Sequence, residues 1–269
     1  ECCAIMNIDL DHTEILGDTI ELIAAEKAGI IKPGCSVVMS AQSKEAQNIV
    51  AEICEERGAF LVFSDPLQEK LKGRGLWGQR FDYRDRKDIE ISLLGTYQLS
   101  NAAVVLDIVD TLKRGAWDIP EKAVWRGMKK AHFPGRFEVF SEDPLVIADG
   151  AHNPNGAAEL ARCIREYIPE GKINFVMGVM ADKDYMSMLR ILMPLAEIVI
   201  TVTPDSPRSL PAEKFTKIIE EQFGVEAQAI PDMKDALYAA LCRIGEDEAI
   251  CICGSLYQLG SVQEYFELR

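Results

Sequence analysis

Residues 145–156 read LVIADGAHNPNG, and this stretch decides the fold of the second half of the chain. Leu145–Ala148 is a short apolar run bounded by turn-forming residues, which is typical of a buried strand. Asp149 is a turn former, and Asn153 is a preferred residue for capping the start of a helix. The stretch therefore predicts a strand, a polar loop and a helix that begins near residue 155.

The same alternation of strand and helix continues to the end of the chain. Because parallel strands need crossover helices between them, it predicts an α/β fold with an open, mostly parallel sheet. The expected strands are 145–148, 173–177, 197–202 and 249–253. The expected helices are 155–168, 185–193, 211–223, 232–243 and 256–267. Ligands of such sheets bind beyond the carboxyl ends of the strands. The loops expected to bind a ligand are therefore 149–154, 178–184, 203–209 and 254–257.

The first half has a similar pattern with one interruption. The expected strands are 4–8, 36–40 and 59–63, and the expected helices are 18–28, 44–57, 98–113 and 121–131. Residues 73–94 mix Gly, Trp and Arg without a helical period, which predicts two extended segments that pair as antiparallel strands. Residues 132–136 read HFPGR, and their Pro-Gly predicts a linker between two domains, 1–131 and 137–269.

Length and composition exclude several classes of protein. At about 150 residues per domain, 269 residues correspond to two domains. The formal net charge of −14 argues against a nucleic-acid partner, which requires clustered positive charge. No apolar run approaches the ~20 residues that span a bilayer, so we expect no membrane segment. The sequence has no signal-peptide pattern, and its eight cysteines follow neither a disulfide framework nor a zinc motif. We therefore expect a cytoplasmic protein.

Two residues near the start are candidates for chemistry. His12 follows an aspartate beyond an expected strand, and a neutral histidine is a common ligand of divalent cations. Taken alone, such an Asp-His pair is more often a capping or surface pair. Lys27 is expected in the last turn of a helix, where the helix dipole favours a cation. By itself its position suggests no chemistry.

The second half offers further candidates at its expected loops. Asp149 and His152 can hydrogen-bond a ligand, and the helix that follows them favours an anion at its start. A turn at Asp149 and a cap at Asn153 explain the same residues equally well. Lys183 lies among carboxylates in ADKD and suits a substrate carboxylate, or belongs to a solvated charge cluster. Ser255 can cap the last helix or reach a ligand. The sequence contains no P-loop, G-x-S-x-G or H-E-x-x-H motif.

Seven segments together resemble the folylpolyglutamate synthase and dihydrofolate synthase family, relatives of the Mur ligases. They are IDLDHTEILGDTIELIAAEKAGIIKPG, LLGTYQLSNAAVVLDIV, FPGRFEVF, LVIADGAHNPNGAAEL, GVMADKDYMSML, TPDSPRSLPAE and CGSLYQLG. They follow the order of the family and cover essentially the whole chain. The resemblance implies that residues 1–131 are the remainder of a central ATPase domain. It also implies that residues 137–269 are a Rossmann-like, glutamate-binding domain.

The resemblance also implies roles for individual residues. His12 matches a histidine that binds Mg²⁺. Lys27 matches a lysine that is carbamylated, which turns an ammonium into an anionic ligand that helps to hold a second Mg²⁺. The expected contacts to ATP come from Asn101, Arg136, Asp149 and His152. The expected contacts to the incoming glutamate come from Asn153, Lys183 and Ser255. Lys27 and His152 are the expected catalytic residues.

The implied reaction is the ATP-dependent formation of an amide. A carboxylate of a folate or of dihydropteroate attacks the γ-phosphate of ATP to give an acyl phosphate, and the amine of L-glutamate then displaces phosphate. Two alternatives remain open: a Mur-type ligase of a peptidoglycan precursor, and a non-catalytic binding fragment. The family places its P-loop before the first strand seen here. We therefore expect this chain to be a monomeric piece of a larger protein, with little activity of its own.

Overall fold

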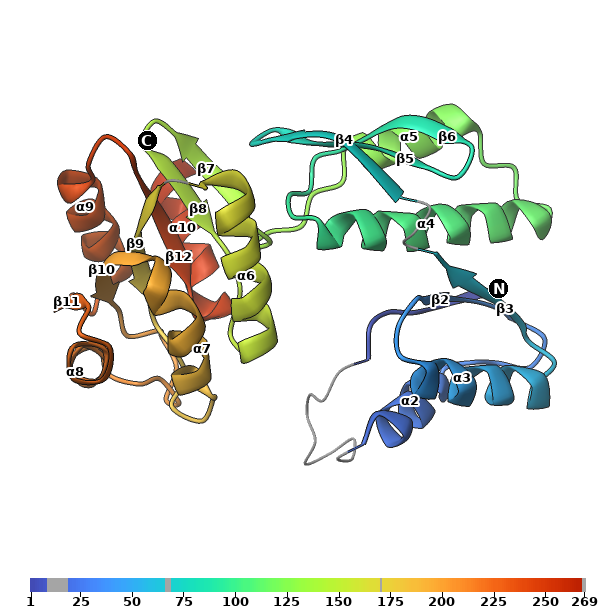
Figure 1. Ribbon diagram of the computed structural model, residues 1–269, viewed down its shortest axis with the longest axis horizontal. Coiled ribbons are helices and arrows are strands. Elements are labelled where there is room, and N and C mark those ends of the chain that lie inside the picture. Colours follow the sequence, from blue (N-terminus) through green and yellow to red (C-terminus); the bar gives the residue numbers. More distant parts are fainter. Residues whose placement is uncertain (9–18, 66–68, 170, 268–269) are drawn as a thin grey trace. The chain divides into compact units, whose positions relative to one another are not determined.

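The computed structural model describes residues 1–8, 19–65, 69–169 and 171–267 (Figure 1). The chain forms two compact units. The first consists of Glu1–Ser92 and Thr96–Ala131, and the second consists of Leu93–Gly95 and His132–Arg269. Among the described helices, none is long and apolar enough to cross a membrane.

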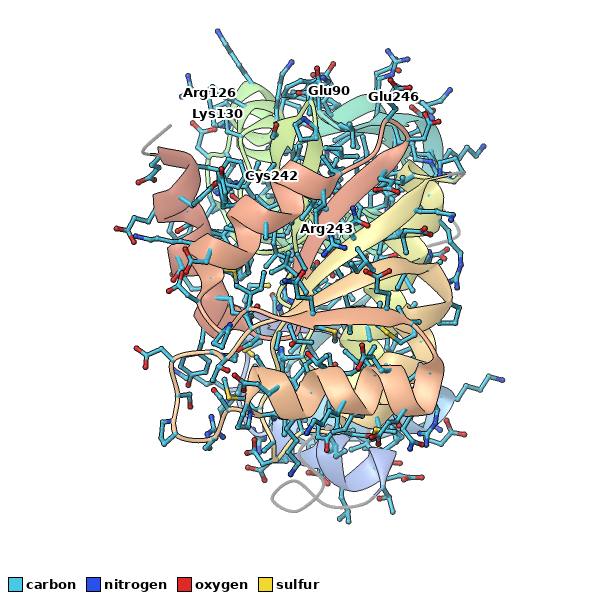
Figure 2. All side chains as sticks on the ribbon, turned by 90° about the vertical axis from the view of Figure 1, so that its left-hand side faces the viewer. Glu90, Arg126, Lys130, Cys242, Arg243 and Glu246 are labelled. Carbon is cyan, nitrogen blue, oxygen red and sulfur yellow. The ribbon has the colours of Figure 1, made fainter. Side chains whose placement is uncertain are left out.

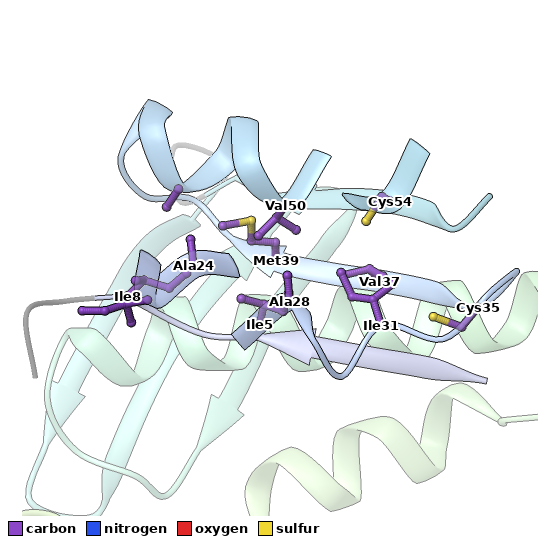
Figure 3. Close-up of a cluster of buried hydrophobic side chains, with 12 residues drawn as sticks. Ile5, Ile8, Ala24, Ala28, Ile31, Cys35, Val37, Met39, Val50 and Cys54 are labelled. Carbon is purple, nitrogen blue, oxygen red and sulfur yellow. The ribbon is translucent and has the colours of Figure 1, made fainter. Parts of the chain in front are cut away.

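The first unit contains a three-stranded parallel sheet in the order β1-β2-β3. Its strands are β1 (Cys2–Ile5), β2 (Ser36–Ser40) and β3 (Phe60–Ser64), and the helices between them are α2 (Ile20–Ala28) and α3 (Lys44–Glu56). Cys3 pairs with Val37 and Val37 pairs with Leu61, so the register is continuous across the sheet. Figure 3 shows the apolar core that α2 and α3 form with this sheet.

Helix α3 shows how the sequence sets this packing. The Ser43 hydroxyl accepts a hydrogen bond from the backbone N–H of Ala46 at 3.3 Å, which caps the first turn. Ala46, Val50 and Cys54 follow at intervals of four residues and are buried in the core. This spacing places them on one face of the helix, and that face is the one that covers the sheet.

An antiparallel sheet completes the first unit. Its strands are β4 (Glu69–Gly75), β5 (Gly78–Tyr83) and β6 (Arg86–Ile91), in that order. Helices α4 (Tyr97–Arg114) and α5 (Glu121–Lys129) bury apolar residues against it. Helix α4 also packs on the parallel sheet, on the face opposite α2 and α3 (Figure 1).

The second unit contains a six-stranded sheet in the order β11-β10-β9-β12-β8-β7. Neighbouring strands are parallel except β7, which is antiparallel to β8. The strands are β7 (Glu138–Glu142), β8 (Leu145–Ala148), β9 (Lys172–Met177), β10 (Ala196–Thr201), β11 (Glu226–Ala229) and β12 (Glu248–Cys253). The expected α/β fold with a mostly parallel sheet is therefore confirmed.

Helices cover both faces of this sheet. They are α6 (Pro154–Tyr167), α7 (Tyr185–Leu192), α8 (Ala212–Phe223), α9 (Met233–Arg243) and α10 (Leu259–Glu267), with short turns η2 (Met193–Leu195) and η3 (Leu256–Gln258). Val176 and Ile252 pack with α9 and α10. Thr201 points to the opposite face, where its hydroxyl donates to the carbonyl of Ala212 in α8 at 2.9 Å. At the edge, Arg243 of α9 (Figure 2) pairs with Glu226 of β11 at 3.0 Å.

Several expected boundaries differ from those observed. The expected strand 4–8 is Cys2–Ile5, because the chain leaves the sheet and the N–H of Ile8 donates to the Gln42 side chain at 2.8 Å. Three antiparallel strands form where two extended segments were expected. The additional turn includes Arg84, which has a φ of 50°. The edge strands β7 and β11 had not been expected.

Candidate functional site

The carboxyl ends of four parallel strands meet at one edge of the second-unit sheet. Strands β8, β12, β9 and β10 are neighbours in the sheet, so the loops that follow them lie along this edge. Backbone hydrogen bonds join the loops to one another. The N–H of Gly254 donates to Ala151 at 2.9 Å, and the N–H of Ala181 donates to Arg208 at 2.8 Å. The N–H of Gly178 donates to Cys253 at 3.3 Å and links the two pairs of loops at the edge where ligands of parallel sheets bind.

Asp149 follows β8 and is buried at this edge, with 7% of its surface exposed. Its Oδ2 accepts a hydrogen bond from the N–H of Phe137, and its Oδ1 accepts one from the N–H of Ala151, both at 2.8 Å. Burial raises the pKa of the carboxyl, whereas these two bonds and the charges of Arg136 and His152 oppose the rise. Both oxygens are bonded to backbone, so Asp149 holds the linker and the loop after β8 in a fixed relation.

This connection fixes Arg136 at the site. Phe137 is buried and has a φ of 46°, a left-handed conformation that is uncommon for a residue other than glycine. Its ring packs against Tyr167 with the centroids 5.4 Å apart. The half-buried Arg136 guanidinium lies 5.7 Å from the centre of the Phe133 ring. The packed neighbours of Arg136 therefore limit where its positive charge can lie.

His152 and Asn153 lead into helix α6. The carbonyl oxygen of Gly150 lies 2.8 Å from His152 Nδ1, so Nδ1 donates and Nε2 carries the lone pair of the neutral ring. The side-chain oxygen of Asn153 accepts from the N–H of Gly156 at 2.7 Å and caps the helix. The Asn153 side-chain NH₂ group and His152 Nε2 are thus the groups that can still meet a ligand.

The structure gives Ser255 and Lys183 different surroundings. Ser255 is 4% exposed, and its hydroxyl oxygen accepts from the N–H of Tyr257 at 3.2 Å. Capping is therefore one function of Ser255, while its O–H can still donate. Lys183 is half-buried, and its acidic neighbours are engaged elsewhere. Asp182 pairs with Arg208 at 3.0 Å, and Asp184 caps α7. Lys183 forms no ion pair within the part of the chain that the structure describes.

Gln258 is a polar residue at this edge that the sequence reasoning missed. It is 3% exposed, and neither atom of its amide has a hydrogen-bond partner among the described residues. The amide fills the space that a side chain at position 178 would need, since a Cβ on Gly178 would lie 2.2 Å from Gln258 Nε2. A signal was present in the sequence: a glutamine follows the Gly-Ser of an expected ligand loop by three residues.

The remaining predicted residues belong to the first unit. Lys27 is exposed in the last turn of α2, and its Nζ donates to the carbonyl of Asn7 at 3.2 Å. Asn101 lies in α4, where its NH₂ group donates to Gln98 at 2.9 Å. His12 lies outside the described residues. The structure therefore groups Arg136, Asp149, His152, Asn153, Lys183 and Ser255 in one unit, with Lys27 and Asn101 in the other.

The described residues contain no complete ligand set for a metal ion. Nowhere in the described ranges do three His, Cys, Asp or Glu side chains come together in a way that could hold one. An unmodified lysine ammonium has no lone pair to offer, so Lys27 as it stands cannot replace the missing ligand. The Mg²⁺ role of His12 and Lys27 stays a prediction.

Comparison with known proteins relates this arrangement to a family. The family described as "Mur ligase, glutamate ligase domain" matches residues 135–256. Folylpolyglutamate synthase of Lacticaseibacillus casei is 33% identical, over 96% of this chain and 60% of that protein. Dihydrofolate synthase/folylpolyglutamate synthase of Bacillus subtilis is 32% identical, over 97% of this chain and 61% of that protein.

A solved structure agrees with these sequence matches. Folylpolyglutamate synthase of Mycobacterium tuberculosis, crystallised with ADP and AMPPCP, superposes with a TM-score of 0.84 at 26% identity. The match covers 98% of this chain and 63% of that one, so the chain spans about three fifths of the length of its relatives. Residues 135–256 match the Mur ligase glutamate ligase domain family, and the chain as a whole is similar to folylpolyglutamate and dihydrofolate synthases.

Proposed function

We propose that this protein is an ATP-dependent ligase that joins L-glutamate to a carboxylate of a folate or of dihydropteroate. One observation carries the proposal. In a domain that matches glutamate ligases, the carboxyl edge of the sheet carries Arg136 and His152 beside a buried, backbone-bonded Asp149, and Lys183 on the loop after β9. Such an edge offers cations and hydrogen-bond donors to anionic substrates, and every substrate of this reaction is an anion.

The reaction has two steps. A carboxylate oxygen of the folate attacks the γ-phosphorus of ATP, and ADP leaves, which gives an acyl phosphate. The amine of L-glutamate then attacks the acyl carbon, inorganic phosphate leaves, and the nitrogen loses a proton as the amide forms. Both steps spread negative charge over phosphate oxygens, so positioned cations and donors are the main source of acceleration.

The residues of the second unit suit two parts of this chemistry. The Arg136 guanidinium, held beside Asp149, is placed to bind phosphate oxygens, because a planar guanidinium matches their geometry. Asp149 acts by fixing the backbone on both sides of this group. His152 Nε2 is available to accept a proton or a hydrogen bond, since Nδ1 is committed to Gly150. Asn101 of the first unit is proposed to contact the adenine.

Glutamate is proposed to bind at Lys183, Ser255 and Asn153. The Lys183 ammonium has no acidic partner among the described residues and can take a substrate carboxylate. The Ser255 hydroxyl and the Asn153 NH₂ group retain donors after their capping bonds are counted. Together these groups offer one positive charge and two directed hydrogen bonds to the carboxylates of the amino acid.

Mg²⁺ is proposed as the metal that accompanies ATP and neutralises part of its charge. His12 and a carbamylated Lys27 are the proposed ligands. Replacing Lys27 by alanine should abolish glutamate-dependent turnover without unfolding α2, because the exposed side chain makes, among the described residues, only the one bond to Asn7. Unchanged turnover in this variant would remove the carbamate from the mechanism.

We further propose a cytoplasmic monomer that does not act on nucleic acid. The net charge of −14 disfavours polyanionic partners. All eight cysteines lie within the described residues and are free thiols, a state that reducing compartments maintain.

The test is ADP release by the full-length gene product, measured with and without L-glutamate and with dihydropteroate or a tetrahydrofolate as acceptor. Lys183→Ala should raise the KM for L-glutamate about tenfold or more and leave the KM for ATP unchanged, because a charged contact to one substrate is lost. Lys214→Ala, at an exposed lysine of α8, is the matched control. Absence of glutamate-dependent ADP release with either acceptor contradicts the proposed function. A KM for L-glutamate that Lys183→Ala leaves unchanged contradicts the role of that residue.

A further inference from the structure

An open cavity lies in the first unit, and none of its lining residues has a role in the proposed reaction. It has a volume of about 530 Å³ and is lined by residues of β4, β5, β6 and the end of α5. All the lining residues belong to the first unit. The volume falls within the range of roughly 300–1,000 Å³ that is typical of small-molecule sites.

The floor of this cavity is peptide backbone. Gly75 pairs with Gly78, and Gly73 pairs with Arg80, across β4 and β5. Arg80 in turn pairs with Glu90 of β6, so these five residues share one face of the sheet. Three of the five have no side chain. The strands therefore present a bare stretch of backbone, flanked by Arg80 and Glu90.

Folding requires only one of these glycines. Gly78 has a φ of 138°, and a Cβ there would lie 2.4 Å from the carbonyl oxygen of Ile91. Gly73 adjoins a shift of register in β4. Gly75 has neither feature: its φ is not in the left-handed region, and a Cβ would meet no atom within 4 Å. Glycine weakens a strand, and where packing does not demand it, it often marks the close approach of a ligand.

The walls supply an aromatic ring and positive charge. Trp77, in the turn between β4 and β5, is 79% exposed, the largest exposed fraction among the described large hydrophobic residues. The charged lining consists of Arg74, Arg80 and Lys129, with one carboxylate, Glu90 (Figure 2), which lies 2.5 Å from Lys129. Asp88, outside the lining, lies 3.7 Å from Arg80, so three cations stand against two carboxylates and the cavity is locally cationic in a chain whose net charge is −14.

We propose that this cavity binds a planar heteroaromatic molecule that carries a carboxylate or a phosphate group. The ring lies on the bare backbone of β4 and β5 and against the Trp77 indole, where flat surfaces stack. The anionic group lies at Arg80 and Lys129, whose donors match carboxylate and phosphate oxygens. This site stands independently of the proposed function, since none of its residues takes part in the ligase reaction.

The test is calorimetric titration of the chain at low salt with two probes, pteroate for the carboxylate and AMP for the phosphate. Trp77→Ala should weaken binding about tenfold or more, as loss of a stacking partner does. Gly75→Val should abolish binding without lowering the melting temperature, because the added side chain enters open space and β-branched residues favour strands. Trp117→Ala, at a tryptophan that is 52% exposed and outside the cavity lining, should leave binding unchanged.

The pattern of responses decides the proposal. Binding of pteroate alone identifies a carboxylate ligand and binding of AMP alone a phosphate ligand, and binding of both supports the shared chemistry. The proposal is overturned if neither probe binds. It is also overturned if Trp77→Ala and Gly75→Val both bind as tightly as the wild type. If Gly75→Val lowers the melting temperature, its loss of binding is not used. The proposal then stands if Trp77→Ala binds the probe more weakly than Trp117→Ala, and is overturned if the two bind equally well.

Discussion

Glu69 is expected to make the stability of the first unit depend on pH. It begins β4 and is half-buried, and burial raises the pKa of its carboxyl from 4.5 to about 7. Ser100 donates a hydrogen bond to Glu69 Oε2 at 3.5 Å and opposes this shift, whereas the charge of Asp65 adds to it. Because the folded chain holds this proton more tightly than the unfolded chain, protonation of Glu69 stabilises the fold.

The magnitude of this stabilisation follows from the size of the shift in the pKa of Glu69. A change from 4.5 to about 7 corresponds to about 3.4 kcal/mol, at about 1.36 kcal/mol per pKa unit. Solvent screens a half-buried group, so we expect about 1–2 kcal/mol of this to remain. The stabilisation is fully present below pH 4.5. It is lost as the pH rises towards and through 7, and little changes at higher pH.

Glu69→Gln isolates this effect, because it keeps the shape of the side chain and removes the titration. The variant should be more stable than the wild type by about 1–2 kcal/mol at pH 8.5 and similar to it at pH 5. Amide exchange in β4 and α4 reports the local stability, since two units need not unfold together. Glu52→Gln, at an exposed position of α3, is the control. A carboxyl titration midpoint near 4.5 by NMR, or equal pH dependence of wild type and Glu69→Gln, would refute the reasoning.

Three further substitutions test other contacts. Tyr83→Phe should destabilise the first unit by about 1.5–3 kcal/mol, because it removes the 2.7 Å hydrogen bond to the buried Asp107 carboxylate. Denaturant unfolding measures this loss, and Tyr257→Phe, at a tyrosine that is 62% exposed, should have no effect. Asn153→Ala should cost about 1 kcal/mol through loss of the α6 cap, seen as faster amide exchange in its first turn. Gln258→Leu should not lower the melting temperature of the second unit and should raise it if the amide makes no bond in the free protein.

The central elements of the fold could be predicted from the sequence because they are buried. Strand β8 has the predicted bounds, Leu145–Ala148, and β9, β10 and β12 differ from expectation by one residue at their ends. The two missed strands, β7 and β11, lie at the edges of the sheet. Edge strands bury little, so their residues need not be apolar. Strand β11 reads EAQA and carries no hydrophobic run to recognise.

The candidate site was predictable only in part. The loops at the carboxyl edge follow from the order of strands and helices, and so does the cap at Asn153. The pairing of Asp149 with Phe137 does not, because it depends on a backbone bond across twelve positions and on a left-handed residue that is not glycine. The unpartnered amide of Gln258 could not be predicted either, because burial of a polar side chain depends on tertiary packing that no local pattern encodes.

The negative charge of the chain and its proposed anionic substrates are compatible for a physical reason. Exposed charges are screened over about 8 Å at physiological ionic strength, so most of the surface carboxylates contribute little at a given site. A guanidinium or ammonium in contact with a bound anion is screened much less, particularly where packing excludes water. A polyanion such as nucleic acid contacts a large part of the surface at once and is repelled by the net charge of −14. A small anion interacts mainly with the charged groups next to it. Net charge therefore argues against nucleic acid and leaves the small-molecule site to be decided by Arg136, His152 and Lys183 themselves.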